Sequence, residues 1–317
     1  MKVLLTGGAG FIGGHVAEAF LARGDEVWIV DDLSTGRRGN VPAGAEFRRM
    51  DIRDEALREL FREVGGFDLV SHHAAQIDVR VSVAHPRRDA GINIDGFLNV
   101  LELVARHRTG RFIFVSSGGV VYGEPDMIPT PETAPKLPLS PYGVSKLAAE
   151  FYLHYYHRVH GLDYVALRYS NVYGPRQDPH GEAGVVAIFS QKILAGEPLT
   201  IYGDGEQTRD YVYVGDVARA NLAASDAKLP QASSLDDRAF NVATGRETSV
   251  NELAAALQRV AGREVELKRA DARPGELERS CLDTARLEST GWTAATPLAD
   301  GLAKTFAHIA ETEGKRA

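Results

Sequence analysis

Hydrophobic residues along this chain form two patterns, which alternate up to about residue 171. Short apolar runs have the length of buried strands, whereas longer segments with apolar residues every three or four positions are typical of amphipathic helices. The predicted strands are residues 2–6, 26–30, 46–50, 69–71, 112–116 and 164–168. The predicted helices are residues 11–21, 54–64, 92–107 and 142–160. The alternation predicts an α/β fold, a Rossmann-type doubly wound parallel sheet with helices on both faces.

Beyond residue 171 the predicted elements are shorter and mixed. They are helices at 185–195, 217–225 and 250–261, strands at 199–202, 211–214 and 240–242, and loops at 174–181 and 273–276. We interpret this half as a smaller mixed α/β domain that brings a substrate to the sheet. The predicted division is 1–171 plus about 214–245 for the sheet domain, and about 172–213 plus 246–317 for the substrate-binding domain.

A glycine motif, Thr-Gly-Gly-Ala-Gly-Phe-Ile-Gly at residues 6–13, joins the first predicted strand to the first helix. Gly7 would allow the tight turn, Gly10 the close approach of the backbone to phosphate, and Gly13 the packing of helix on strand. The free N–H groups and the positive dipole end of such a helix favour a pyrophosphate. The spacing is G-x-x-G-x-x-G, and the surrounding strand-turn-helix-strand unit is what a dinucleotide site requires.

The second predicted strand ends at a pair of carboxylates. Asp31 lies 18 residues after Gly13, close to the distance expected of an acid that binds the adenosine ribose. A carboxylate there accepts from the 2′-hydroxyl and repels a 2′-phosphate, which favours NAD over NADP. Arg37 and Arg38 follow closely and would oppose that preference, but we expect them to lie in a solvated loop.

Tyr142 and Lys146 are four residues apart, so they lie on the same side of a predicted helix. A free phenol is a poor base at neutral pH, but a nearby ammonium group and a positive nicotinamide ring stabilise the phenolate. The pair therefore predicts hydride transfer to or from a nicotinamide, with Tyr142 as the general base. It follows a strand that ends in two serines, Ser116 and Ser117, where ligands bind in such sheets.

The composition excludes several other classes of protein. The chain has 317 residues, of which 44% are apolar and 25% charged, and its net charge of -7 argues against a nucleic-acid surface. No apolar run approaches the ~18 residues of a membrane span, and the N-terminal run is too short for a signal peptide. The only cysteine, Cys281, precludes an intrachain disulfide and fits a cytoplasmic protein; we expect it to be structural.

The chain resembles the extended short-chain dehydrogenases/reductases that act on nucleotide sugars and, among them, the UDP-glucose 4-epimerases. Besides residues 6–13, the motifs that carry the resemblance are Asp-Ile-Arg at 51–53, Asn-Ile-Asp-Gly at 93–96, Ser-Ser at 116–117, Val-Tyr-Gly at 121–123, Tyr-Gly-Val-Ser-Lys at 142–146, Arg-Tyr-Ser-Asn-Val-Tyr-Gly-Pro at 168–175, Arg-Asp-Tyr at 209–211 and Arg-Pro-Gly-Glu at 273–276. They cover nearly all of the chain.

The resemblance implies which residues bind the two ligands. The residues expected at NAD are Gly7, Gly10, Phe11, Ile12, Gly13, Asp31, Asp32, Ser34, Thr35, Gly36, Asp51, Ile52, His73, Ala74, Ala75, Asn93, Tyr142, Lys146 and Tyr169. Those expected at the UDP-sugar are Ser117, Gly118, Tyr142, Asn171, Val185, Val186, Thr200, Tyr202, Arg209, Arg273 and Glu276. No metal is expected. The family also implies a homodimer formed through the helices at 92–107 and 142–160.

The same resemblance implies a redox-neutral cycle. Tyr142 takes the proton of the sugar 4-hydroxyl while NAD takes the C4 hydride, the 4-keto sugar turns over in the pocket, and the hydride returns to the opposite face. The expected catalytic residues are Tyr142, Lys146, Ser117 and Ser116, because the family's usual hydroxyl position is Gly118 here. Ser117, Ser116 or a water could replace that hydroxyl, and Ser117 is preferred.

Other functions remain open at this stage. Ser280 stands where narrower epimerases have a tyrosine, so an N-acetylated sugar is a further expected substrate. UDP-glucuronate or a CDP-sugar is the main alternative. The glycines at 118 and 119 replace the acid–base pair that dehydratases use, which disfavours that branch. Two further alternatives are a nucleotide-sensing scaffold, disfavoured by the intact Tyr142 and Lys146, and a metal site of Asp178, His180 and Glu182.

Overall fold

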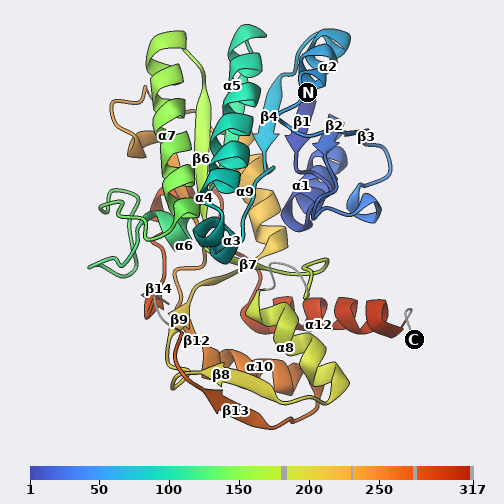
Figure 1. The fold of residues 1–317 in the computed structure, drawn as a ribbon, viewed down its shortest axis with the longest axis vertical. Helices are drawn as coiled ribbons and strands as arrows, with labels where there is room; N and C mark the ends of the chain where they lie inside the picture. The colour runs from blue at the N-terminus through green and yellow to red at the C-terminus, as the bar shows by residue number, and fades with distance from the viewer. Residues whose placement is uncertain (180–183, 230, 274–276, 315–317) are drawn as a thin grey trace.

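The computed structural model describes residues 1–179, 184–229, 231–273 and 277–314 (Figure 1). Seven parallel strands form the main sheet, in the order β11-β6-β5-β4-β1-β2-β3. Their bounds are β1 Lys2–Thr6, β2 Glu26–Asp31, β3 Glu46–Arg49, β4 Leu69–His72, β5 Arg111–Ser117, β6 Tyr164–Tyr169 and β11 Ala239–Val242. The predicted α/β fold with a doubly wound parallel sheet is confirmed.

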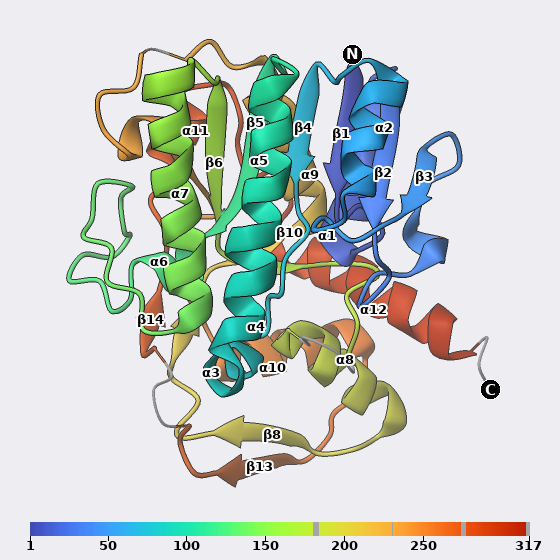
Figure 2. The same ribbon diagram turned by 45° about the horizontal axis from the view of Figure 1, so that its top comes forward.

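Helices cover both faces of this sheet, as Figure 2 shows with α5 and α7 in front. The helices packed on the sheet are α1 Phe11–Ala22, α2 Ala56–Val64, α5 Phe97–Arg106, α7 Pro141–His160 and α9 Val214–Asp226. One hydrophobic cluster joins α1 and α9 to the sheet, and a second joins α2, α5 and α7 to the opposite face. The central strands are apolar on both sides because both faces are covered.

A smaller lobe lies below the carboxyl ends of the strands (Figures 1 and 2). Its helices are α8 Val185–Ala195, α10 Val250–Ala261 and α12 Leu298–Gly314, which share a third hydrophobic cluster with β8. Its strands pair as β8 Leu199–Tyr202 with β13 Leu267–Ala270, and as β12 Thr248–Ser249 and β14 Arg279–Ser280 with β9 Thr208–Arg209. A parallel pair, β7 Asn171–Tyr173 and β10 Tyr211–Tyr213, leads from the sheet into the lobe.

Several short elements lie outside the main sheet and the long helices. They are α3 Val79–Ala84, α4 Pro86–Ala90, α6 Gly118–Val121, α11 Ala285–Glu288, a π-helix at Gly91–Gly96 and 3-10 turns at Arg38–Asn40 and Asp236–Arg238. The predicted helix at 92–107 is thus a π-helical segment followed by α5. The predicted strand at 211–214 ends at Tyr213, because Val214 begins α9 and is buried in it. The helix α12 was not predicted, although its Leu302 and Ile309 are buried on one face.

The order of the strands decides where ligands can bind. Chain connections run from β1 through β2 to β3 on one side, and then return to β4 on the other side of β1. At such a switch point the loops after β1 and β4 separate and leave a crevice outside the carboxyl ends. The glycine motif follows β1, and His73 follows β4, so both border this crevice.

Candidate active site

The glycine turn packs tightly against the loop that follows β4. Gly7 has φ +70°, and a Cβ placed on it would lie 2.6 Å from the amide nitrogen of Ala74. A Cβ on Gly13 would lie 2.3 Å from the Gly7 carbonyl oxygen, so only glycine fits there. Gly10 caps the N-terminus of α1 without a side-chain hydrogen bond, and Phe11 and Ile12 form the first turn. The N–H groups of this turn are therefore available to an anionic ligand.

Asp31 ties the end of β2 to the glycine turn. Its carboxylate accepts hydrogen bonds from the N–H groups of Ala9 at 3.0 Å and Leu33 at 2.8 Å. Burial raises the pKa of Asp31, and the two backbone donors oppose that shift. A Cβ on Gly36 would lie 2.7 Å from Asp31 Oδ1, so the loop folds directly over the carboxylate. Thus the structure brings the predicted phosphate-binding and ribose-binding groups together.

The rest of this loop is more exposed. Asp32 accepts from the N–H and hydroxyl of Ser34, and Thr35 is exposed beside them. Arg37 pairs with Asp178 at 2.5 Å. Arg38 lies over the ring of Phe47, with its guanidinium carbon 4.7 Å from the centroid. Both arginines therefore have partners outside the carboxylate pair, which agrees with a loop that does not select a 2′-phosphate.

Asp51 and Ile52 follow β3, one strand farther from the switch point. The Asp51 carboxylate accepts from Arg53, whose positive charge lowers the pKa of Asp51. Ile52 is buried, and a Cβ on Gly96 would lie 2.8 Å from its Cδ1. Ile52 therefore packs against Gly96 of the π-helix, while Asp51 is half-buried.

Two adjacent histidines end β4 and are both neutral. The ring of His72 hydrogen-bonds Thr6 Oγ1 at 2.8 Å and packs among Phe97, Phe112 and Phe114. Burial holds its pKa well below the usual range, and the charge of Lys146 lowers it further. Burial also lowers the pKa of His73 to about 3.

The loop that follows the two histidines is hydrogen-bonded to Thr6, the last residue of β1. His73 Nε2 shares a hydrogen bond with Ser71 Oγ at 2.8 Å. The Ala74 N–H donates to Thr6 Oγ1 at 3.3 Å, and Ala75 is half-buried after it. The polypeptide therefore leaves β4 in a fixed direction toward the glycine turn.

Asn93, which is predicted to lie at the cofactor, hydrogen-bonds the loop after β4. Its Oδ1 accepts from the Gln76 N–H at 2.9 Å, and its Nδ2 donates to the Gln76 carbonyl at 2.8 Å. Nδ2 also donates to Asp89 at 2.9 Å. Asn93 lies in the π-helix, a distortion that is frequent at functional sites. Asn93 therefore fixes the backbone of the Gln76 loop against the π-helix.

Tyr142 and Lys146, the predicted catalytic pair, lie at the beginning of α7. Ser140 caps this helix by accepting from the Gly143 N–H at 3.1 Å, and Pro141 occupies its first position. Lys146 is 3% exposed, and its Nζ donates to the Val115 carbonyl at 2.9 Å. Nζ lies 5.8 Å from the ring centroid of Tyr142, and burial lowers the pKa of Lys146 to about 8. An ammonium is thus held beside the phenol.

The two serines at the end of β5 have different surroundings. Ser116 is buried, and its hydroxyl donates to Glu150 Oε1 at 2.5 Å. Ser117 points to the other face of the sheet and is in register with Tyr169 on β6. Within the described part of the chain, no hydrogen bond holds the Ser117 hydroxyl. Ser116 is therefore committed to a structural acid, whereas Ser117 remains available to a ligand.

Gly118 has a steric reason to be glycine. A Cβ at this position would lie 2.4 Å from Leu282 Cδ1. Leu282 is buried in a small hydrophobic cluster with Val121, Tyr122 and Ala243. Leu282 therefore occupies the space that a hydroxyl-bearing side chain at 118 would need.

Tyr169 lies at the end of β6 on the α9 face of the sheet. Its hydroxyl accepts from Asn221 Nδ2 at 2.7 Å, and burial raises its pKa. Asn221 also accepts weakly from Ser71 at 3.4 Å, and Ser71 contacts His73. A polar chain thus connects the ends of β4 and β6 beneath the predicted nicotinamide position.

The residues predicted to bind the UDP-sugar lie in the small lobe or lead into it. Asn171 is exposed, and its N–H donates to the Asp210 carbonyl. Val185 is half-buried, but the side chain of Val186 belongs to the lobe's hydrophobic cluster, so only its backbone can face a ligand. Thr200 accepts from Lys192 at 3.5 Å. The contacts of these four residues do not by themselves define a ligand pocket.

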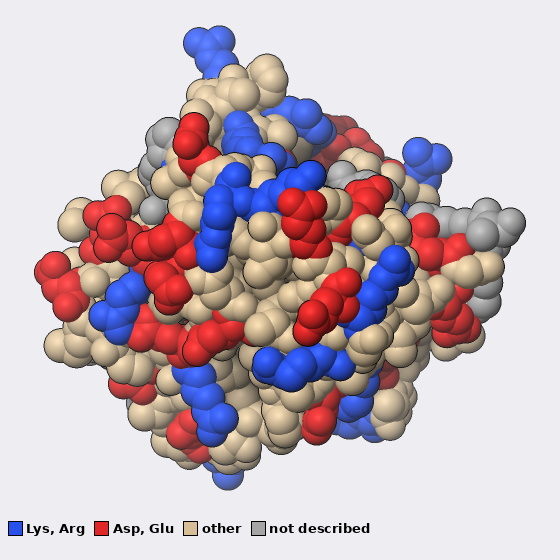
Figure 3. All heavy atoms as spheres, turned by 90° about the horizontal axis from the view of Figure 1, so that it is seen from below, with Lys and Arg blue, Asp and Glu red and all other residues tan. Residues whose placement is uncertain are grey.

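The predicted pyrophosphate-binding arginines lie on different parts of the lobe, Arg209 in β9 and Arg273 in the loop after β13. Arg273 stacks on Tyr202, with its guanidinium carbon 3.8 Å from the ring centroid. Arg209 donates to the Thr208 carbonyl at 2.7 Å and is in register with Ser280, which is 6% exposed. Glu276 lies outside the described residues. Seen from below, acidic and basic residues are interspersed, and no large patch of one sign covers this face (Figure 3).

Other predicted or possible sites receive less support. Among the described residues, no three His, Cys, Asp or Glu side chains could hold a metal, and His180 and Glu182 lie outside that part of the chain. Cys281 is buried beside Asp210, whose charge and the burial raise the thiol pKa to about 12. No helix of the described chain is long and apolar enough to cross a membrane.

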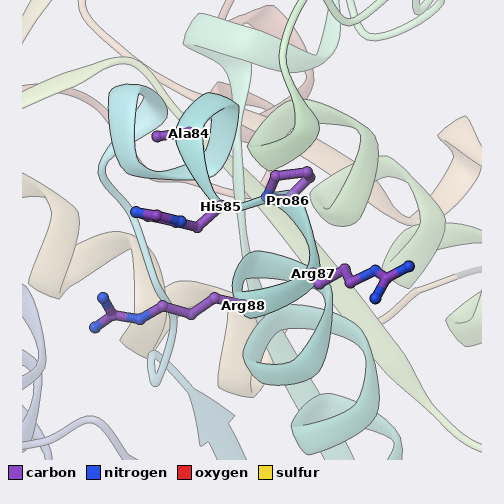
Figure 4. Close-up of a pocket in the computed structure, with 5 residues that line it drawn as sticks. All are labelled: Ala84, His85, Pro86, Arg87 and Arg88. Atoms are coloured by element: carbon purple, nitrogen blue, oxygen red, sulfur yellow. The ribbon is translucent and has the colours of Figure 1, made fainter.

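A hollow of about 570 Å³ lies beside α3 and α4 and is lined by residues 84–88. In Figure 4 the side chains of Arg87 and Arg88 point in opposite directions rather than toward a common centre. None of the predicted site residues lines this hollow. It therefore has no converging groups that would define a second site.

Sequence reasoning missed the supports behind the predicted residues. Asp89 and Gln76 hold Asn93, Glu150 holds Ser116, and Asn221 holds Tyr169. The spacing of Asp89 and Asn93, four residues apart on one helical face, was the only sequence signal for any of them.

The chain is similar to a family of known enzymes and to several solved structures. The model of the NAD dependent epimerase/dehydratase family matches residues 3–243. A UDP-glucose 4-epimerase from Thermotoga maritima, whose crystal structure contains UDP-glucose, is 44% identical, with a TM-score of 0.94 over 99% of this chain and 100% of that one. A UDP-glucose 4-epimerase from Thermus thermophilus, in complex with NAD, is 46% identical, with a TM-score of 0.90 over 98% and 99% of the chains.

A third structure broadens the range of sugars among similar proteins. It is a UDP-N-acetylglucosamine 4-epimerase from Methanobrevibacter ruminantium in complex with UDP-N-acetylmuramic acid. It is 34% identical, with a TM-score of 0.91 over 98% of both chains. Similar folds therefore act on sugars with and without an N-acetyl group.

Proposed function

Because the chain belongs to the NAD-dependent epimerase/dehydratase family, we propose that it interconverts UDP-glucose and UDP-galactose by inverting carbon 4 through a 4-keto intermediate. The observation that carries the proposal is the buried Lys146 ammonium beside Tyr142, at the end of the strand that carries Ser117. The pair adjoins the crevice bordered by the glycine turn. This arrangement suits redox chemistry at a sugar hydroxyl and requires no metal.

The residues around the crevice fit NAD. Gly7 and Gly13 let the turn pack closely at the N-terminus of α1, whose N–H groups would bind the pyrophosphate, and Asp31, which accepts from the Ala9 N–H of this turn, would bind the adenosine ribose. When bound, NAD supplies an acceptor and donor for the C4 hydride. The loop residues 34–36 and Asp51–Ile52 would enclose the adenosine. Ala74, Ala75, His73 and Tyr169 would border the nicotinamide half.

Tyr142 would move the proton and Lys146 would make this possible. The ammonium stabilises the phenolate, so the tyrosine takes the 4-hydroxyl proton at neutral pH and later returns it. Ser117 would donate to or accept from the O4 atom during both steps, since Ser116 is engaged by Glu150. Burial keeps water from the Lys146 ammonium, which strengthens its effect on the phenolate.

The small lobe would bind the UDP moiety. Arg209 and Arg273 carry the planar cations that match phosphate oxygens, and Tyr202 and Thr200 would border the uridine with Val185 and the backbone of Val186. Asn171, Gly118 and Glu276 are proposed to complete the sugar and ribose contacts. In this division, residues 1–171 with about 214–245 bind NAD, and about 172–213 with 246–317 bind the nucleotide sugar.

An exposed apolar face on α7 supports a homodimer. Its members are Val144, Phe151, Tyr152, Tyr155 and Val159, each at least 39% exposed. Apolar surface of this kind is unusual on a free helix and is typical of an interface. Light scattering after gel filtration should give twice the chain mass, and Phe151→Arg with Tyr155→Arg should give the monomer. A buried, unpaired cysteine also fits a cytoplasmic location.

A second candidate substrate is the N-acetylated pair, UDP-N-acetylglucosamine and UDP-N-acetylgalactosamine. The observation behind it is Ser280, a small side chain in register with Arg209 on β9. An N-acetyl group needs space beside carbon 2 of the sugar, and a serine leaves more of it than a tyrosine. Turnover of UDP-N-acetylgalactosamine by the purified protein tests this candidate directly.

The deciding experiment uses purified protein and UDP-galactose without added NAD. Appearance of UDP-glucose by chromatography would establish both the activity and a retained cofactor. Activity that appears only after NAD is added would support the proposed reaction and show that the protein does not retain NAD through purification. No conversion even with NAD would overturn the proposed substrate, and UDP-N-acetylhexosamines, UDP-glucuronate and CDP-sugars would then be assayed in turn.

A further inference from the structure

Asp89 in α4 is a buried carboxylate that forms three hydrogen bonds but no salt bridge within the described chain. Its Oδ1 accepts from Gln76 Nε2 at 3.0 Å and from Asn93 Nδ2 at 2.9 Å. Its Oδ2 accepts from the Ser145 hydroxyl at 2.6 Å. A carboxylate without exposure to water is costly unless hydrogen bonds and a nearby positive charge compensate. The position therefore calls for an explanation beyond packing.

The hydrogen bonds of Asp89 connect three segments that border the crevice. Gln76 belongs to the loop after β4, and it also accepts from the Asp78 N–H at 2.6 Å. Asn93 belongs to the π-helix and clamps the Gln76 backbone. Ser145 belongs to α7 and directly precedes Lys146. Asp89 is thus the common acceptor that fixes the catalytic helix against the loop from β4.

The charge of Asp89 also acts on Lys146. The titratable groups that face Lys146 are Asp89 from α4, Glu150 and Tyr142 from α7, and His72 and His73 from β4. Asp89 and Glu150 raise the pKa of Lys146 against the larger effect of burial.

The two carboxylates are not equivalent. Glu150 is paired with Arg168 at 2.6 Å and also accepts from Ser116, so its charge is largely neutralised locally. The lowered pKa values of His72 and His73 leave both rings neutral, so neither adds a charge near Lys146. Asp89 is therefore the carboxylate whose charge is free to act on the Lys146 ammonium.

We propose that Asp89 is a positioning residue for the reaction: it holds α7 against the loop after β4 and supplies the counter-charge that keeps Lys146 protonated. The inference rests on the proposed function, because it assigns Asp89 an effect on the Tyr142 and Lys146 pair. Asp89 itself contacts neither the substrate nor the reacting atoms. Its two contributions, geometry and charge, are separable by substitution.

Asp89→Asn removes the charge and keeps the shape, whereas Ser145→Ala removes one hydrogen bond and keeps the charge. In Asp89→Asn, Lys146 should lose its proton at lower pH, so the alkaline limb of the turnover profile should move down by about one pH unit, equivalent to about a tenfold loss of turnover on that limb. In Ser145→Ala, turnover should fall by a similar factor at every pH, and the limb should stay in place.

A second measurement does not depend on turnover. The phenolate absorbance of Tyr142, obtained by subtracting the spectrum of Tyr142→Phe, should appear at higher pH in Asp89→Asn than in the wild type. If Asp89→Asn does not fold, Asp89→Glu keeps the charge and displaces it, and it should lower turnover without moving the alkaline limb.

Identical pH profiles for Asp89→Asn, Ser145→Ala and the wild type would reduce Asp89 to a packing residue and overturn the proposal. A shift of the alkaline limb by a full pH unit in Asp89→Glu, which keeps the negative charge, would also contradict it. If the wild type converts no UDP-hexose, the proposed function fails, but the phenolate titration still decides the role of Asp89. The two failures are therefore distinguishable.

Discussion

The end of the seven-stranded sheet and the small lobe hold their predicted site residues in different ways. At the sheet end, Lys146 and Asn93 are nearly inaccessible to solvent and have hydrogen bonds of 2.8–2.9 Å to the protein. In the lobe, Thr200 has one bond of 3.5 Å, and Arg273 is exposed and stacked on Tyr202. We therefore expect the Lys146 ammonium to keep its position when a ligand binds, and the exposed Arg273 side chain to adjust more readily.

The difference follows from the elements that carry each set. Ser117 ends a seven-residue strand inside the sheet, and Tyr142 and Lys146 lie at the capped start of a 20-residue helix. In the lobe, Thr200, Tyr202 and Arg209 lie on strands of two to four residues, and Arg273 lies in a loop. Positions on rigid elements hold a reaction geometry more closely than short strands and loops do. Variation in substrate should therefore come from the lobe, and loss of chemistry from the sheet.

The largest effect should come from removing the hydroxyl at the fixed end. Tyr142→Phe keeps the ring and removes the general base, so turnover of UDP-galactose should fall by about 10²–10⁴-fold. Extraction and quantification of NAD should show that the cofactor is retained. Tyr213→Phe, in a strand of the chain away from α7, is the matched control. Substantial activity in Tyr142→Phe would remove the tyrosine from the mechanism.

The burial of Lys146 should appear as a pH dependence of stability. Its pKa is about 8 in the folded protein and 10.5 in its ordinary state, so between these pH values the unfolded chain binds the extra proton. Stability of the wild type therefore rises with pH in that window, by about 3 kcal/mol in total. Lys146→Met lacks this rise. Urea titrations at pH values across the window should show the free-energy difference between the two proteins changing by that amount.

The two serines should separate chemistry from stability. Ser117→Ala should lower turnover by about 10- to 100-fold with little change in unfolding, because its hydroxyl is available to the substrate. Ser116→Ala should lower the free energy of unfolding by about 1–3 kcal/mol, since it leaves buried Glu150 short of a donor. Kinetics and urea unfolding on both variants decide the assignment. The reverse pattern would move the catalytic hydroxyl to Ser116.

The contact of Gly118 with Leu282 should appear as coupling between two positions. Gly118→Ala places a methyl group against Leu282 Cδ1 and should destabilise the protein by about 1–3 kcal/mol. In a Leu282→Ala background the same substitution should cost less, because the space is then open. A double-mutant cycle measured by unfolding gives the coupling energy. Additive effects would mean that the two side chains do not compete for this space.

The smallest effect should come from a substitution in the small lobe. Ser280→Tyr fills space beside Arg209 and should lower turnover of UDP-N-acetylgalactosamine several-fold more than that of UDP-galactose. The ratio of kcat/KM for the two substrates is the measurement. Ser280→Ala serves as the control and should keep the ratio. An unchanged ratio in the tyrosine variant would place the N-acetyl group elsewhere.

Much of the fold was predictable because the signals were local and periodic. The parallel sheet follows from apolar runs separated by helical patterns, and the bounds predicted for α8 and α10 agree with the structure. The missed helix α12 shows the limit: its apolar positions have a meaning only when the lobe's other helices are present to cover them. The π-helix was also invisible, since its register depends on Asp89 and Gln76 from other segments.

The sequence alone determined the chemistry. Glycines at fixed offsets and an acid after the second strand predict a dinucleotide site. A tyrosine and a lysine one helical turn apart predict a proton-transfer pair, because their spacing within one helix fixes their relative geometry. Only the tertiary structure showed that Ser116 is engaged by Glu150, explained Gly118 by Leu282, and joined Asp89 to Ser145, the residue before Lys146. These depend on which face of a strand meets which helix, and contacts between segments distant in sequence leave no local pattern to detect.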